Sequence, residues 1–277
     1  MTVTLADVVG VLDRLYDPRW AASWDAVGLV TGDPDQPVRR VMLAVDPVQV
    51  VIDEAIAWET DLLVTHHPLL LRGVHGVAAT GPKGRAVTDL VRAGVALHVA
   101  HTNADVADPG VSDALAGVLG VSGLRPLQVD PSAADGRRGL GRVGRLDVPT
   151  TLESFADAVT AALPRTEAGL RVAGDPDRPV HTVAVCGGAG DDLFDEVRAS
   201  GVDVFVTADL RHHPASEALE HGTPALVDCS HWATEWPWLA DAQRLLLAGL
   251  GAGADTVETR VSTVVTDPWT SHQRSQS

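Results

Sequence analysis

The spacing of apolar residues alternates between helix-like and strand-like periods along the first hundred residues. Residues 5–16 predict an amphipathic helix, which ends before Asp17-Pro18; its apolar face consists of Leu5, Val8, Val9, Leu12 and Leu15. The elements predicted after it are a strand at 38–45, a helix at 49–59, a strand at 61–65, a helix closing at 88–92 before Gly94, and a strand at 95–100. Strands that alternate with helices predict βαβ units and a largely parallel sheet.

The polarity changes between residues 127 and 142, where the run D-P-S-A-A-D-G-R-R-G is typical of a linker. The run G-L-G-R-V-G, residues 139–144, matches the glycine spacing of a dinucleotide-binding turn. No strand is predicted before it, and a strand-like pattern continues through it where a helix would be needed. We therefore do not expect a nucleotide to bind there.

The chain contains an internal repeat. The segment from Val41 to Pro68 is a strand, a helix and a strand leading to T-H-H-P, and the segment from Thr182 to Pro214 repeats this order and ends in R-H-H-P. The next strand of each half leads to a His-x-x-x-acid motif, which ends at Asp105 in the first half and at Glu235 in the second. Two copies of one α/β unit predict strand ends that converge on a shared crevice, with a metal site between the halves.

His66 and His67 stand at the end of the predicted strand 61–65, and Pro68 stops that strand. Side chains alternate along a strand, so these two imidazoles point to opposite sides. Both imidazoles could not easily coordinate one metal ion, whereas each could coordinate one of two ions that lie a few ångströms apart. Two adjacent histidines therefore favour a dinuclear centre over the alternative of a histidine satisfied within the core.

The exit from strand 95–100 carries a second group of ligand-type residues. His101 and Asp105 are separated by T-N-A, and Asn103 and Asp105 also fit turns that bond their own backbone. We favour coordination for Asp105 because the equivalent residue of the repeat is an acid.

His231 and Glu235 are four residues apart, and two geometries are open for them. On one helix they would share a face, but Pro237 favours a helix that starts near Glu235, with His231 at the strand's end. Either geometry brings an imidazole and a carboxylate to one ion. The alternative is that Glu235 only begins the following helix.

The second adjacent pair, His212-His213, would overfill the site if both residues were ligands. We expect one of them to orient a ligand or face a substrate, with Asp209 able to hold it in place. Asp46 is a weaker candidate for the same supporting role. The run C-G-G-A-G that starts at Cys186 could present backbone N–H groups to an anion or could form a simple tight turn.

The composition restricts the classes of function. The formal charge is −16, with 37 acidic against 21 basic residues, which argues against nucleic-acid binding because that needs a basic surface. No apolar run is long enough to span a bilayer, no basic export signal opens the chain, and two cysteines are too few for a disulfide framework. We therefore expect a cytoplasmic protein that binds neither membranes nor nucleic acid.

Six ordered motifs carry a resemblance to a known family; they are W-D-A-V-G-L, T-H-H-P-L, A-H-T-N-A-D, C-G-G-A-G, A-D-L-R-H-H and S-H-W-A-T-E. The chain resembles the YbgI-like (NIF-three-like) dinuclear metal-centre proteins, whose members often carry the name GTP cyclohydrolase I type 2 homologue. The resemblance covers residues 5 to about 269, in a short form without the extra domain that some members insert near the middle. It differs from the family pattern at Ala26, Ala208 and His212, where Asn, Gly and Tyr are usual.

The resemblance implies five metal ligands and two residues that line the same cavity. The implied ligands are His66, His67, Asp105, His231 and Glu235, and the cavity residues are His101 and His213. It also implies a ring-shaped homohexamer and a first domain that recruits the C-terminal part of the chain. We accordingly expect one α/β domain at 1–126 with 226–277 and a second at 127–225, with mixed, mostly parallel sheets flanked by helices.

Two functions are compatible with such a site. The first is a metal-dependent hydrolase with two divalent ions per chain, in which a water bridging the ions attacks a small-molecule substrate and His101 or His213 moves protons. The second is a non-catalytic metal protein, such as a metallochaperone or a regulatory partner. Imidazole and carboxylate ligands suit zinc, iron, manganese or nickel, so the residues do not identify the metal.

Overall fold

A computed structural model describes residues 2–222 and 224–273. The chain divides into two compact units. Unit 1 comprises Met1–Ala107 and Leu239–Thr266, and unit 2 comprises Asp108–Trp238 and Asp267–Ser277. The domain division expected from the sequence, 1–126 with 226–277 and 127–225, stays a prediction.

Within the described residues, unit 1 is built on a five-stranded sheet in the order β1-β4-β3-β2-β11. Its strands are β1 (Gly28–Thr31), β2 (Arg40–Ala44), β3 (Leu62–Thr65), β4 (Ala96–Val99) and β11 (Glu258–Val261). The strands β11, β2, β3 and β4 are parallel, and β1 runs antiparallel to β4. The carboxyl ends of three neighbouring parallel strands therefore meet at one edge of the sheet.

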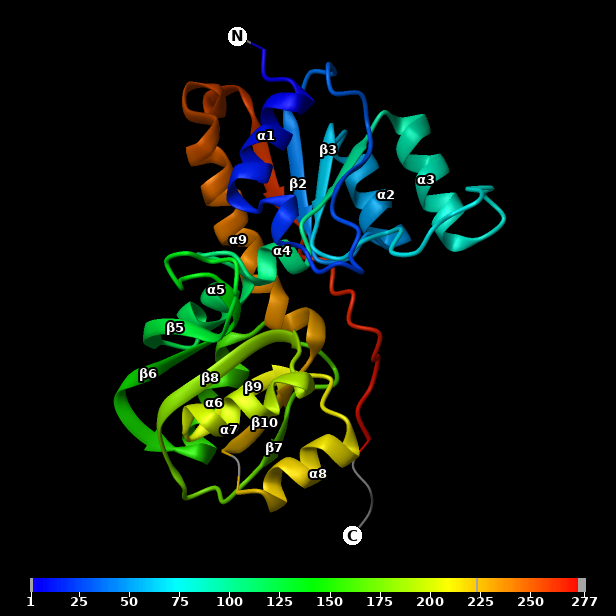
Figure 1. Cartoon of the computed structure of the whole chain (residues 1–277). Helices are drawn as coiled ribbons and strands as arrows, with labels where there is room; N and C mark the ends of the chain where they lie inside the picture. Colours follow the sequence, from blue (N-terminus) through cyan, green and yellow to red (C-terminus); the bar gives the residue numbers. More distant parts are fainter. Residues whose placement is uncertain (1, 223, 274–277) are drawn as a thin grey trace. The chain divides into compact units, whose positions relative to one another are not determined.

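Helices cover both faces of this sheet. They are α1 (Leu5–Leu15), α2 (Gln49–Ala57), α3 (Pro82–Ala93), α4 (Thr102–Asp105) and the later part of α9 (His231–Leu250), with the 3₁₀ turns η1 (Pro18–Trp20) and η3 (Gly251–Thr256). In Figure 1, α1 and α9 lie on one side of β2 and β3, and α2 and α3 lie on the other. On the α2 and α3 side, Met42, Leu63 and Leu97 of the strands pack with Ile52 and Leu90.

The start of α1 shows why the sequence pattern predicted this helix well. Thr4 accepts a hydrogen bond from the Asp7 N–H, and the Asp7 side chain accepts one from the Thr4 N–H, which is a complete capping box. The buried face contains Leu5, Val8 and Leu12, as the 3.6-residue period requires.

Within its described residues, unit 2 is built on a six-stranded sheet in the order β5-β6-β8-β9-β10-β7. Its strands are β5 (Val121–Val129), β6 (Gly139–Thr151), β7 (Arg171–Ala173), β8 (Pro179–Ala189), β9 (Val204–Ala208) and β10 (Ala225–Cys229). The helical segments are α5 (Val111–Val118), α6 (Leu152–Ala162), η2 (Asp191–Leu193), α7 (Phe194–Ser200), α8 (His212–Glu220) and the start of α9. The parallel strands β8, β9 and β10 are flanked by antiparallel β5, β6 and β7. The expected α/β class with mixed sheets is therefore confirmed.

The predicted linker at 127–142 is wrong. Its first residues end β5, its last residues begin β6, and only the polar middle forms the turn between these antiparallel strands. The pattern favoured a linker because a long turn and a linker share Gly, Asp and Ser. The run at 139–144 lies inside β6, which agrees with the expectation that it does not form a nucleotide-binding turn.

The internal repeat is visible in the backbone of both units. In unit 1, Asp61 accepts hydrogen bonds from two successive N–H groups at the start of β2; in unit 2, Asp203 does the same at the start of β8. Gly32 follows β1 and Gly174 follows β7, with φ of +130° and +142°. A Cβ at either glycine would clash with the alanine that begins the neighbouring strand. The two halves therefore share their framework residues as well as their order of elements.

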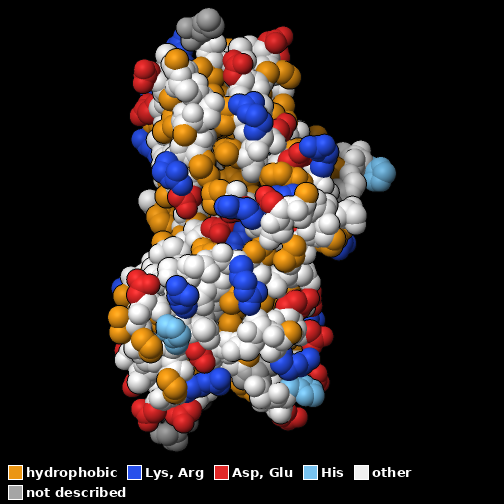
Figure 2. All heavy atoms as spheres, turned by 60° about the vertical axis from the view of Figure 1, so that its left-hand side comes forward, with side chains coloured by type: hydrophobic (Ala, Val, Ile, Leu, Met, Phe, Trp, Pro, Cys, Tyr) orange, Lys and Arg blue, Asp and Glu red, His pale blue; other side chains and the backbone are white. Residues whose placement is uncertain are grey.

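None of the helices formed by the described residues combines the length and apolar composition that crossing a bilayer requires. On the face shown in Figure 2, Asp and Glu side chains are interspersed with Lys and Arg side chains.

Candidate metal centre

Two histidines extend from the carboxyl end of β3 in unit 1. The backbone bends at both residues directly after the strand, and the N–H groups of His66 and His67 donate to the carbonyl oxygens of Ala44 and Val45. The two side chains therefore converge, whereas the sequence predicted that they point to opposite sides. Their ring centroids are 5.1 Å apart, and His66 is fully buried.

His101 comes to the same place from the end of β4. The ligand-type atoms of His66, His67 and His101 all lie within 4.8 Å of one another. Asp105, at the end of the short helix α4, places its Oδ1 atom 3.7 Å from Nε2 of His66. Unit 1 thus brings together four of the residues expected in the site.

Hydrogen bonds at Nδ1 set the orientation of the first two imidazoles. The Nδ1 atom of His66 is 2.9 Å from the carbonyl oxygen of Ala100, and that of His67 is 2.7 Å from Oδ1 of Asp46. A carbonyl or carboxylate oxygen can only accept, so each Nδ1 donates and the lone pair remains on Nε2. This arrangement is characteristic of histidines that bind metals through Nε2. Asp46 has the supporting role that the sequence suggested for it.

His101 is held in the same way by a residue to which the sequence assigned no role. Its Nδ1 lies 2.9 Å from Oδ1 of Asp25, whose other oxygen accepts hydrogen bonds from the N–H and the hydroxyl of Thr102. Asp25 lies within the motif W-D-A-V-G-L, and this motif was the only signal that could have identified it.

Burial lowers the pKa of His101 below its usual 6.5, and the neighbouring His66 adds to the effect, while Asp25 opposes it. Burial works to raise the pKa of Asp25, but the hydrogen bonds from His101 and Thr102 outweigh it, so this pKa is lowered. The pair is therefore a neutral imidazole donating to a carboxylate, which leaves His101 ready to accept a proton at Nε2.

The remaining two expected ligands belong to unit 2. The helix α9 begins at His231 and continues through Pro237, so the helical geometry is the correct one of the two considered. The Nε2 atom of His231 lies 2.8 Å from Oε1 of Glu235, one turn along. Its Nδ1 lies 2.7 Å from Oδ2 of Asp209, which occupies the left-handed region with a φ of +57°. Asp209 therefore orients His231, whereas the sequence suggested that it orients His212 or His213.

The glycine-rich run after Cys186, predicted as a turn, lies inside β8 and supports the His231–Glu235 pair. The N–H of Gly188 donates to the hydroxyl of Thr234, and its carbonyl accepts from the hydroxyl of Thr207. A Cβ at Gly188 would lie 2.6 Å from Oε1 of Glu235, so any residue other than glycine would displace this carboxylate. The N–H group of Gly188 is bonded to Thr234, and that of Gly187 is bonded to Ser112, so this part of β8 does not present them to an anion.

The second His-His-Pro motif is not equivalent to the first. His212 and His213 form the first turn of α8, beyond the end of β9, and both are exposed. The ring of His213 contacts that of His212, with the centroids 5.1 Å apart. The structure therefore groups His66, His67, His101 and Asp105 in unit 1 and His231 and Glu235 in unit 2, and the role of His213 stays a prediction.

The donor set of each cluster fits a divalent cation. Neutral imidazoles with carboxylates suit borderline ions such as zinc, iron, manganese and nickel. In unit 1, three imidazole rings converge with Asp105, and in unit 2, Nε2 of His231 meets the buried carboxylate of Glu235. Oxygen acceptors on all four Nδ1 atoms supply the outer support that metal-binding histidines require.

These features define an α/β protein of two related halves, each of which carries a histidine and carboxylate cluster at the ends of parallel strands. The family described as Duf34/NIF3 (NGG1p interacting factor 3) matches residues 3–268, and the chain belongs to this family. The resemblance inferred from the six sequence motifs is thereby confirmed.

The chain is similar over nearly its whole length to curated relatives. A Streptomyces coelicolor protein named GTP cyclohydrolase 1 type 2 homolog is 57% identical over 97% of this chain and 94% of the relative. A Mycobacterium tuberculosis protein with the same name is 38% identical over 97% of each chain.

Solved structures confirm the fold. A Bacillus cereus protein related to NIF3 superposes with a TM-score of 0.89 at 24% identity, covering 98% of this chain and 99% of the other. A hypothetical protein from Staphylococcus aureus superposes with a TM-score of 0.88 at 28% identity, with the same coverage.

Proposed function

We propose that this chain is a dinuclear divalent-metal protein that acts as a metal-dependent hydrolase. The proposed ligands are His66, His67, Asp105, His231 and Glu235. The observation that carries the proposal is shared by both units: an oxygen acceptor on Nδ1 orients each clustered histidine, as it does in histidines that bind metals through Nε2.

Divalent ions held by these residues would supply Lewis acidity, which makes water a stronger nucleophile near neutral pH. The residues of the chain would bind and orient the ions and move protons. Asp105 and Glu235 have the carboxylates able to bridge two ions. His101, whose pKa is lowered by burial, is neutral near pH 7 and would accept a proton at Nε2. His213 is our second candidate for proton transfer.

The name of the relatives, GTP cyclohydrolase 1 type 2 homolog, agrees with a reaction in which water opens a ring. In a cyclohydrolase reaction, water attacks the imidazole ring of the purine and formate leaves. We propose hydrolysis of a small molecule and do not specify GTP, because the described residues include no motif for recognising guanine.

The proposal is tested by elemental analysis of natively purified protein, followed by a hydrolase screen with that metal restored. The screen should include nucleotides, phosphate esters and cyclic amides. We expect turnover in the wild type and its loss in a His101→Gln variant that retains its metal content. A protein that binds two ions, transfers them readily to a chelator and turns over no substrate would instead be a metal carrier.

A further inference from the structure

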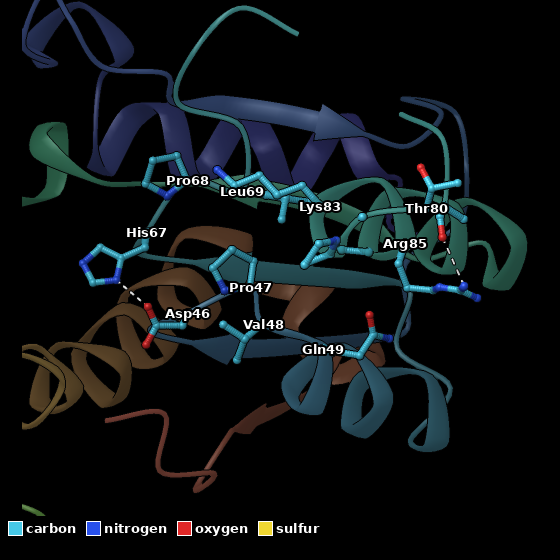
Figure 3. Close-up of a pocket in the computed structure, with 14 residues that line it drawn as sticks. Asp46, Pro47, Val48, Gln49, His67, Pro68, Leu69, Thr80, Lys83 and Arg85 are labelled. Atoms are coloured by element: carbon cyan, nitrogen blue, oxygen red, sulfur yellow. Dashed lines mark hydrogen bonds and ion pairs between the residues drawn. The ribbon is translucent and has the colours of Figure 1, made fainter. Parts of the chain in front are cut away.

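A pocket of about 590 Å³ opens next to His67 in unit 1. It is formed by three segments: the turn after β2, the residues after β3 and the first turn of α3. Figure 3 shows His67 at one end, held by Asp46, and Arg85 at the other. A volume of this size falls within the range of about 300–1,000 Å³ that is usual for small-molecule sites.

The walls of the pocket are mostly carbon. They are formed by Pro47, Val48, Pro68, Leu69, Pro82 and Ala86. Three prolines among these residues hold the backbone stiffly, so the apolar surface is preformed. Such walls fit the apolar or aromatic body of an organic molecule better than they fit an ion alone.

The charge of the pocket is opposite to that of the chain. The chain has a net charge of −16, yet Lys83 and Arg85 both line this pocket. Asp46 is the one acidic residue among its described lining residues, and its carboxylate is already bonded to His67 and to the Thr266 hydroxyl. The pocket therefore has two cations that its own carboxylate does not neutralise.

Two helices begin at the pocket and add to its positive potential. Val48 and Gln49 lie at the start of α2, and Gly81 and Pro82 lie at the start of α3. Neither helix has a side-chain cap or an acidic residue in its first turn. The positive ends of both helix dipoles therefore remain available to an anion.

The two basic side chains are placed differently. Arg85 donates to the carbonyl oxygen of Ala79, which fixes its guanidinium at the far end of the pocket. In Figure 3, the Lys83 side chain extends from α3 toward Pro68, the residue next to His67. The exposed Lys83 side chain is flexible and can turn from this position toward Arg85, so that both hold one anionic group. The rest of the ligand would then lie along the apolar wall, with its other end toward His67.

We infer that this pocket binds a small organic molecule that carries a phosphate group, with the phosphate held by Lys83, Arg85 and the two helix ends. The inference deepens the proposed function by naming the class of substrate. The role of the ligand as a substrate rests on the proposed hydrolase function. The binding of the phosphate group does not, because it requires no metal ion.

The sequence offers a direct probe, because Lys83 is the single lysine of the chain. Reductive methylation with ¹³C-formaldehyde labels only this side chain and the α-amino group. Titration of metal-stripped protein with phenyl phosphate near neutral pH should shift the Lys83 signal and saturate, while the α-amino signal stays constant. Phenol should leave both signals unchanged, and inorganic phosphate should shift the Lys83 signal only at higher concentrations than phenyl phosphate.

Matched variants test the assignment by calorimetry. Lys83→Ala and Arg85→Ala should each weaken phenyl phosphate binding by about tenfold or more, which corresponds to the loss of one charge-assisted hydrogen bond. Arg92→Ala, an exposed basic residue in the last turn of the same helix, should leave binding unchanged. Lys83→Arg should retain most of the affinity, which excludes a fold defect as the cause.

Three results would overturn the inference: an unshifted Lys83 signal, equal affinity for phenyl phosphate and inorganic phosphate, or equal losses in Lys83→Ala and Arg92→Ala. A His231→Ala variant, at a proposed metal ligand that does not line the pocket, separates this inference from the proposed function. It should lose metal and still bind phenyl phosphate. Phosphate-ester binding in a protein that hydrolyses nothing would support the pocket and contradict the hydrolase.

Discussion

An alanine in place of Gly188 tests how closely the backbone of β8 sets the geometry of the His231–Glu235 pair. Gly188 has a φ of +71°, and a Cβ built there would lie 2.6 Å from Oε1 of Glu235 and 3.1 Å from Nε2 of His231. The substitution therefore adds backbone strain and pushes on both proposed ligands.

The two effects should appear in different measurements. A non-glycine residue in the left-handed region costs about 1–2 kcal/mol, so the free energy of unfolding should fall by about that amount. The clashing carboxylate is the far end of a flexible side chain, so it moves aside and adds little to this loss. Displacing a ligand should weaken metal binding by about 10–100-fold, the usual effect of losing its structural support.

Gly201→Ala is the matched control, because Gly201 has a φ of +68° and an added Cβ would meet nothing within 4 Å. Urea denaturation of both chelated variants should give similar losses of unfolding free energy. Titration with zinc should show weak binding in Gly188→Ala and wild-type binding in Gly201→Ala. Equal zinc affinities in the two variants would refute the role assigned to Gly188.

Four further outcomes are expected. Metal-stripped protein should take up two divalent ions per chain, and saturation at one equivalent would contradict the dinuclear centre. The His67→Ala variant should bind metal more weakly at one site or both, whereas His212→Ala should bind metal as the wild type does. Bound metal should stabilise the fold by about 2.7 kcal/mol at one hundred times its dissociation constant, and this gain should fade as histidines protonate below about pH 6.5; a melting temperature unmoved by chelation would exclude it. Burial raises the pKa of the Cys229 thiol from 9.0 to about 12, so it should resist alkylation at pH 8 until the protein unfolds, and stability should fall as the pH rises above 9; rapid labelling of the folded protein would contradict this. Light scattering should give a homohexamer of 29.0 kDa chains, and a monomer at micromolar concentration would rule this assembly out.

The alternation of strands and helices and the ends of β3 and β4 could be predicted, because they depend on local hydrophobic period and on breaking residues. Pro68 and Gly94 mark a strand end and a helix end in the sequence, and the structure places both where the pattern did. Once these ends were known, parallel pairing was sufficient to bring His66 and His101 together.

The different secondary structure of the two His-His-Pro motifs could not be predicted from their amino-acid sequences. In unit 1 the histidines follow β3 directly, whereas in unit 2 the strand ends at Ala208 and the histidines begin α8. Proline fits the first turn of a helix as readily as it stops a strand, so Pro68 and Pro214 leave both outcomes open. The residue after β9 that supports the site is instead Asp209, in a left-handed conformation that glycine usually adopts.

The support of His101 by Asp25 was beyond local patterns for a different reason. The two residues are 76 positions apart, and Asp25 lies in a loop without helical or strand periodicity. Only the three-dimensional path of that loop brings the carboxylate to the imidazole.

The discontinuity of unit 1 has a consequence for biosynthesis. On the ribosome, at about 5–20 residues per second, the roughly 150 residues between Ala107 and Val261 take about 8–30 s to emerge. Throughout that time β2 lacks its parallel neighbour β11, so the nascent sheet has an open edge able to pair with other chains. Arg39 and Arg40, at the start of β2, place charge on this edge when the newly made chain is most exposed to aggregation.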